Sequence, residues 1–173
     1  MVGVFVLVGG WPGAGKSTLA AALAAELGVP LLAKDEIKEA LMDGLGRPAT
    51  VPESRRLGRA AVLVMLRVAR HCPSAVLDGT WFDYTVPLLR RLPGPLVEVH
   101  CAVPVELARQ RYLARAGHRH AGHLDDQRTE DELWGTRYRP LGLGPAIEVD
   151  TSVPVDVPLL AMRIRSNSGG LSH

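Results

Sequence analysis

The sequence predicts an α/β protein in which a five-stranded parallel sheet carries helices on both of its faces. Along the 173 residues, short apolar runs rich in Val and Leu alternate with longer segments whose apolar residues recur at helical spacing. This alternation indicates parallel strands, because a parallel strand is reached through a long crossover that is usually a helix. Glycine and proline fall between the two kinds of segment, which supports the division.

Five apolar runs are predicted to be strands and six segments to be helices. The strands are residues 2–8, 29–33, 75–77, 96–102 and 146–149. The helices are residues 16–27, 35–43, 53–71, 84–92, 105–115 and 155–165. Gly28-Val29-Pro30 ends the first helix, and Pro104 suits a helix start. We expect a single domain of residues 1–166 with a flexible tail of residues 167–173.

Composition and charge indicate the cellular compartment and restrict the kinds of binding partner. The 20 basic and 18 acidic residues give a net charge of +2, too small for the field that drives nonspecific nucleic-acid binding. Cys72 and Cys101 show no metal or redox spacing, so reduced thiols in a cytoplasmic protein are expected. The apolar run 2–8 is too short to span a bilayer and lacks a basic flank, so we predict neither a targeting signal nor a membrane partner.

The segment from Gly10 to Ser17 matches the phosphate-binding pattern G-x-x-x-x-G-K-[ST] in full, between a predicted strand and a predicted helix. Its glycines let backbone N–H groups wrap a phosphate, and the helix N-terminus favours the negative charge. Lys16 is predicted to bridge the β- and γ-phosphates, and Ser17 to bind Mg²⁺. The predicted nucleotide-binding residues of this P-loop are Gly10, Trp11, Pro12, Gly13, Ala14, Gly15, Lys16, Ser17 and Thr18.

Asp35 follows the second predicted strand and so lies at the sheet edge where doubly wound folds bind ligands. A carboxylate beside the γ-phosphate can accept the proton of an attacking alcohol, so Asp35 is the predicted general base and also an acceptor contact. The alternative is that Asp35 only caps the following helix, with Glu36 and Glu39 complementing the helix dipole.

Asp78 ends the third predicted strand, in the manner of a Walker B acid, and is predicted to support the Mg²⁺ or to contact the acceptor. The alternative is an ordinary Asp-Gly turn. Thr80 and Trp81 follow at the same edge, and together with Arg59 they complete the predicted acceptor site. The rings of Trp11 and Trp81 either line that site or pack in the core.

A polar segment, approximately residues 116–128, interrupts the strand and helix pattern and is predicted to be a lid. Arg115 and Arg119 are the predicted lid arginines that stabilise the charge of the transferred phosphate and exclude water. A solvated helix face is the alternative for this arginine group. His118, His120 and His123 lie in the same segment without Cys or carboxylate partners at zinc spacing, so no zinc site is predicted.

These residues make the chain similar to the small P-loop kinases of the AAA_33 type, which include chloramphenicol phosphotransferase, zeta toxins and the kinase domain of polynucleotide kinase. The resemblance implies strand order 2-3-1-4-5, ATP as the cofactor, a Mg²⁺ ion held by Ser17, a base at Asp35, and lid arginines at Arg115 or Arg119. It also implies that Arg111 and Thr151 join the nucleotide site, since the loop after the fifth strand flanks the adenine. Shikimate kinases, which are more distant, carry a D-x-D arrangement in which Ala33 replaces the first acid here.

The leading hypothesis for function is a kinase that phosphorylates a hydroxyl of a small molecule, such as a metabolite, nucleoside, sugar or antibiotic. A polynucleotide 5′-kinase or a nucleotide-sugar kinase of the zeta-toxin kind is the second reading, and the near-neutral charge speaks against long nucleic acids. A nucleotide-dependent switch that phosphorylates nothing is the third. Asp35 separates the third from the others, because a switch needs no base for an alcohol.

Overall fold

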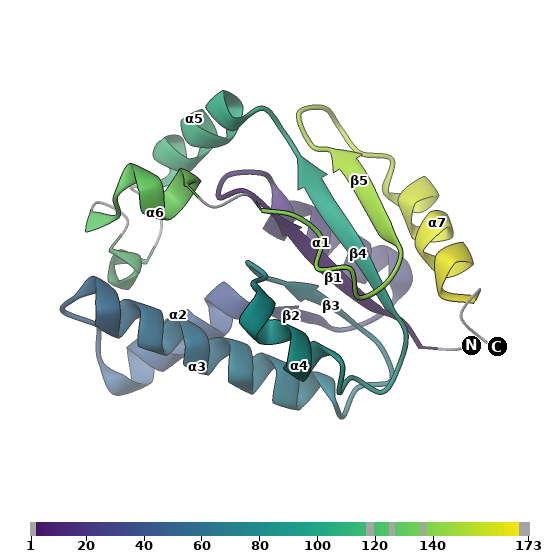
Figure 1. The fold of residues 1–173 in the computed structure, drawn as a ribbon, viewed down its shortest axis with the longest axis horizontal. Helices are drawn as coiled ribbons and strands as arrows, with labels where there is room; N and C mark the ends of the chain where they lie inside the picture. Colours follow the sequence, from purple (N-terminus) through teal and green to yellow (C-terminus); the bar gives the residue numbers. More distant parts are fainter. Residues whose placement is uncertain (1–2, 117–119, 125–126, 136–137, 170–173) are drawn as a thin grey trace.

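The structure is a computed structural model that describes residues 3–116, 120–124, 127–135 and 138–169. Its five strands form one parallel sheet in the order β2-β3-β1-β4-β5, which confirms the predicted fold class and strand order. The strands are β1 (Phe5–Gly10), β2 (Leu31–Ala33), β3 (Ala75–Asp78), β4 (Leu96–Ala102) and β5 (Ala146–Asp150). Figure 1 shows the sheet with helices on either side.

The helices lie close to the predicted segments, with one addition. They are α1 (Lys16–Leu27), α2 (Lys34–Leu45), α3 (Val51–Ala69), α4 (Val86–Leu89), α5 (Val105–Ala116), α6 (Glu130–Trp134) and α7 (Val157–Gly169), together with the short 3₁₀ turns η1 (Asp83–Thr85) and η2 (Ala121–His123). The predicted helix of residues 84–92 is thus a 3₁₀ turn followed by one α-helical turn. No prediction was made for α6, whose five residues are too few to show a helical period.

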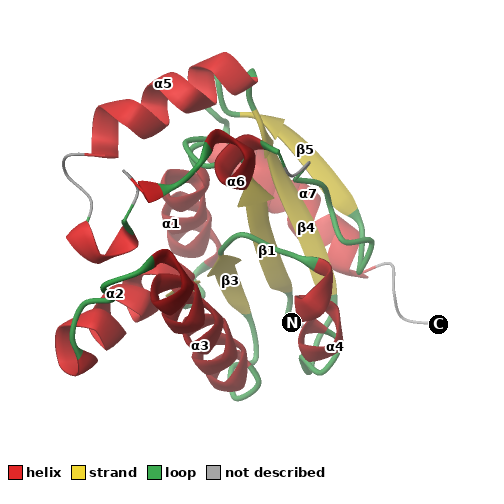
Figure 2. Cartoon of the chain, turned by 60° about the vertical axis from the view of Figure 1, so that its left-hand side comes forward, coloured by secondary structure: helices red, strands yellow, loops and turns green. Residues whose placement is uncertain are grey.

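Two apolar clusters, one on each face of the sheet, hold the layers together. Side chains alternate along β1, so Val6 and Val8 join the cluster with α1 and α7 while Phe5 and Leu7 join the cluster with α3 and α4. All four side chains are at most 1% exposed. The helices therefore fix the sheet from both faces, and Figure 2 shows α1 and α3 on opposite sides of it.

Both cysteine thiols are free, as the sequence predicts. Cys101 is buried on β4, and loss of hydration raises its pKa to about 12, which keeps the thiol neutral and unreactive at physiological pH. Throughout the described ranges, every helix is too short or too polar to cross a bilayer.

Candidate active site

The carboxyl ends of the central strands open on one cavity of about 790 Å³. The P-loop follows β1, Asp78 is the last residue of β3, and α2 begins directly after β2. Because parallel strands end at the same edge, residues far apart in the sequence meet there. The predicted site residues that line the cavity are Pro12, Gly13, Gly15, Lys16, Ser17, Asp35, Arg59, Asp78, Thr80 and Arg115.

The P-loop is shaped by glycines with left-handed backbone conformations. Gly13 has a φ of 78° and Gly15 a φ of 80°, values that L side chains rarely adopt. A Cβ on Gly13 would also lie 2.2 Å from the carbonyl oxygen of Ala108 in α5. Gly13 is therefore needed for two reasons, the loop conformation and the close approach of α5.

We expect Gly13→Ala to destabilise the fold more than a comparable substitution elsewhere. Gly28, which ends α1 with a φ of 67°, is the matched control, because its Cβ would meet nothing within 4 Å. Gly28→Ala should cost about 1–2 kcal/mol in the free energy of unfolding from conformation alone. Gly13→Ala should cost at least about 1 kcal/mol more, since the collision adds to the strain. Equal losses in urea denaturation would show that α5 moves away without penalty.

Lys16 is aimed across the P-loop at the phosphate site. Its Nζ donates a hydrogen bond to the carbonyl oxygen of Trp11 at 2.8 Å. Desolvation lowers the pKa of Lys16, and the nearby carboxylates of Asp78 and Asp35 oppose that shift. A buried cation at the end of the glycine-rich loop, with two carboxylates acting on its charge, is placed to bind a phosphate.

Ser17 and Asp78 form the second part of the phosphate site. The Ser17 hydroxyl donates a hydrogen bond to Asp78, whose pKa is raised mainly by burial, while the hydrogen bond and Lys16 act in the opposite direction. Asp78 is 6% exposed. A hydroxyl and a carboxylate side by side are oxygen ligands of the kind that Mg²⁺ prefers, so these residues fit the predicted metal.

Asp35 lies in the first turn of α2 and faces the cavity. The N-cap of α2 is Ala33, so Asp35 does not cap the helix, although its charge complements the helix dipole. Lys34 Nζ lies 2.7 Å from Asp35 Oδ1, and the Asp35 side chain is 47% exposed. The carboxylate is thus oriented by its neighbour and accessible to a ligand, as a base must be.

Residues 120–124 contact α2 and α3, and His123 among them lines the cavity. His123 Nε2 lies 2.8 Å from Glu39 Oε1, and His120 Nε2 lies 3.2 Å from Asp43 Oδ1. The Ser54 hydroxyl donates to the carbonyl oxygen of Gly122 at 3.2 Å. Two of the three histidines of the predicted lid thus bind carboxylates of α2, while His118 lies outside the described residues.

Aromatic rings join the P-loop to α6. The ring of Trp11 lies 5.7 Å from that of Trp134 and 5.0 Å from that of Tyr138, between ring centroids. Tyr112 of α5 contacts Trp134 edge to face at 5.9 Å, and the Arg109 guanidinium stacks over Trp134 at 5.3 Å. Sequence reasoning missed Trp134 and Tyr138, because they follow a polar stretch and belong to no motif.

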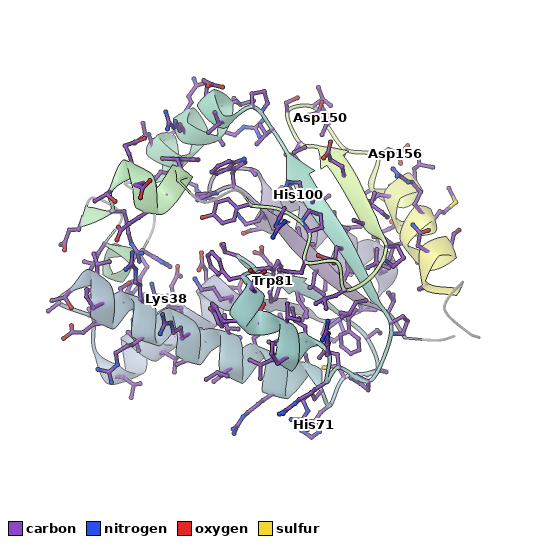
Figure 3. All side chains as sticks on the ribbon, in the orientation of Figure 1. Lys38, His71, Trp81, His100, Asp150 and Asp156 are labelled. Atoms are coloured by element: carbon purple, nitrogen blue, oxygen red, sulfur yellow. The ribbon has the colours of Figure 1, made fainter. Side chains whose placement is uncertain are left out.

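The remaining predicted residues divide into three groups. Arg115 lines the cavity, and its charge contributes to the lowered pKa of Lys16, whereas Arg119 lies outside the described residues. Arg111 Nη1 donates to the Thr151 carbonyl oxygen at 2.9 Å, and the Thr151 hydroxyl donates to Ala14 of the P-loop at 2.7 Å. These contacts connect α5 and the loop after β5 to the P-loop, on the side where Figure 3 labels Asp150.

Trp81 packs in the core instead of lining the large cavity. It is 9% exposed, and its Nε1 donates to the carbonyl oxygen of Val8 at 2.9 Å. A Cβ on Gly9 would lie 3.1 Å from the Trp81 ring, so the ring covers the end of β1. Of the two roles left open for Trp81, these contacts support packing, and its predicted acceptor contact has no support in them.

Three solved structures with the same fold are described as kinases. A candidate kinase from Chloroflexus aurantiacus is 29% identical, with a TM-score of 0.84 over 96% of this chain and 99% of that one. A gluconokinase from Sinorhizobium meliloti gives a TM-score of 0.66 at 22% identity, over 99% and 98% of the two chains. A shikimate kinase from Acinetobacter baumannii, in complex with shikimate, gives 0.59 at 23% identity, over 99% and 97%.

Sequence relatives extend the comparison to longer chains. An uncharacterised protein of Mycobacterium tuberculosis, Rv2004c, is 37% identical over 127 residues, which are 64% of this chain and 25% of the relative. The chain thus spans about a quarter of that relative. A family model described as "AAA domain" matches residues 5–133. With three quarters of its length matched and the P-loop, sheet order and strand-end acid in place, the chain belongs to the AAA_33 family and has the fold of the small P-loop kinases.

Proposed function

We propose that this protein is a kinase that transfers the γ-phosphate of ATP to a hydroxyl group of a small molecule. The observation that carries the proposal is the convergence of Lys16, the Ser17–Asp78 pair and Asp35 on one cavity. Its volume of about 790 Å³ is within the range of small-molecule sites, roughly 300–1,000 Å³, and favours a small acceptor over a polynucleotide.

Each residue has a defined part in the reaction. Asp35 accepts the proton of the acceptor hydroxyl as the oxygen attacks the γ-phosphorus, and the bond from that phosphorus to the β-γ bridging oxygen breaks as ADP leaves. Lys16 neutralises charge on the phosphates, and Arg115, which also lines the cavity, neutralises charge on the transferred group. Ser17 and Asp78 would hold Mg²⁺, which supplies positive charge and an oriented phosphate chain when bound.

Residues 120–124 favour transfer to a hydroxyl over transfer to water. They contact Glu39, Asp43 and Ser54, of which Glu39 and Ser54 line the cavity, and so they shield this part of the cavity from water. Excluding water both strengthens the electrostatic interactions in the site and suppresses ATP hydrolysis.

A transfer screen tests the proposal directly. Purified protein is incubated with [γ-³²P]ATP, with and without Mg²⁺, and with nucleosides, sugars, hydroxy acids, antibiotics or a 5′-hydroxyl oligonucleotide. We expect Mg²⁺-dependent label on one small-molecule class. Tight ATP binding with no label on any acceptor would favour the nucleotide switch, and label on the oligonucleotide alone would favour the polynucleotide kinase.

A further inference from the structure

The side chains that line the cavity include more basic than acidic residues. Among the described lining residues, seven are Lys or Arg and five are Asp or Glu. Three of these acids lie within ion-pair distance of a basic side chain: Asp35 of Lys34, Glu132 of Arg55, and Glu39 of His123. Asp78 belongs to the phosphate site with Lys16.

Three of the arginines that line the cavity remain outside these pairs, namely Arg59, Arg128 and Arg115, and Arg115 is already proposed to act on the transferred phosphate. Arg59 and Arg128 have no proposed role in the reaction. Arg59 lies on α3, one helical turn after Arg55, and Arg128 lies just before α6; both line the cavity. Neither makes an ion pair or a side-chain hydrogen bond with any residue that the structure describes. An unpaired guanidinium facing a cavity is a ready partner for a carboxylate or a phosphate, which it can bind through two parallel hydrogen bonds.

Three aromatic rings connect the two arginines. Phe82 stacks with Tyr84 at 5.9 Å with an interplanar angle of 15°, and lies 6.2 Å from Tyr138. All three rings line the cavity, and Phe82 and Tyr84 are 37% and 50% exposed. The charge of Arg59 acts on the Tyr84 hydroxyl and that of Arg128 on the Tyr138 hydroxyl, in each case opposing a pKa raised by burial. We name these five residues the acceptor wall.

We propose that the acceptor is a ring-bearing alcohol that carries an anionic group, with the ring against Phe82, Tyr84 and Tyr138 and the anion bound by Arg59, Arg128 or both. The proposal rests on the proposed kinase function, since it names the class of molecule whose hydroxyl reaches Asp35. A neutral sugar would leave both guanidiniums without a partner, and an acyclic acid would leave the rings uncovered.

Matched probes test the acceptor class by titration calorimetry with a non-hydrolysable ATP analogue and Mg²⁺ present. One pair is adenosine 3′-monophosphate and adenosine, which tests a phosphate; the other is shikimate and its methyl ester, which tests a carboxylate. We expect the anionic member of at least one pair to bind about tenfold or more tightly than its neutral partner. Arg59→Gln and Arg128→Gln should each weaken that binding by roughly 10- to 100-fold.

The control is Arg56→Gln, which removes the same charge from an exposed residue of α3 that does not line the cavity. It should leave binding of the probes unchanged, while Phe82→Leu should weaken binding of both members of a pair. Equal binding of charged and neutral members, no binding of either anion, or an equal loss in Arg56→Gln would overturn the proposal.

A parallel transfer assay separates this inference from the kinase function on which it rests. Label that moves only to neutral acceptors would reject the anionic acceptor and keep the kinase. Arginine-dependent binding of an anion with no transfer to any acceptor would reject the kinase and keep the anion site.

Discussion

Lys16→Ala should reduce phosphate transfer by about 10²–10³-fold, the loss seen when one preorganised donor to transition-state charge is removed. Lys16 is the cation between the P-loop and the carboxylates of Asp78 and Asp35. Without it, the two carboxylates repel the incoming phosphates as well as each other, so nucleotide affinity should fall together with the rate. Transfer assays measure the loss of rate, and titration with nucleotide measures the loss of affinity.

The control for Lys16→Ala is Arg163→Ala, which removes one positive charge from an exposed position on α7. It should keep wild-type transfer and nucleotide affinity, since it lies on the far side of the sheet from the cavity. An unfolding curve for each variant checks that the fold survives. Transfer by Lys16→Ala at the wild-type rate would mean that the P-loop here does not carry the chemistry.

The parts that could be predicted from the sequence are those fixed by local signals. The P-loop was predictable because a phosphate cradle needs its glycines and its Lys-Ser pair at fixed spacing. α1 was predicted with its observed bounds, Lys16–Leu27, because the motif sets its start and Gly28 its end. The sheet order came through the family resemblance, since alternating strands and helices leave several orders open.

The parts that could not be predicted depend on tertiary contacts. Trp134 meets Trp11 across more than a hundred residues, and no local pattern announces such a contact. Trp81 stands beside Asp78 at the edge of the site in sequence, yet its ring turns into the core and donates to Val8. Arg128 resembles any solvated arginine in the sequence, and only the fold brings it to the same cavity as Arg59.

Asp35→Asn should lower kcat by about 10²–10⁴-fold and leave the KM for ATP almost unchanged, the range expected for loss of a general base. The amide is nearly isosteric with the carboxylate, so Lys34 keeps a hydrogen-bond acceptor at Oδ1 while the proton acceptor is lost. Single-turnover transfer to the acceptor identified in the screen measures the chemical step directly.

Glu36→Gln is the matched control for this last substitution, because it neutralises the neighbouring acid in the same first turn of α2 at an exposed position outside the cavity lining. If the role of Asp35 were only to complement the helix dipole, both variants would show the same small decrease in the free energy of unfolding. Both would then transfer phosphate at the wild-type rate. A large kinetic loss confined to Asp35→Asn separates a base from a dipole partner. Transfer by Asp35→Asn at the wild-type rate would instead show that Asp35 is not the base. Other residues would then align the acceptor hydroxyl, and its proton would move to the phosphate or to solvent.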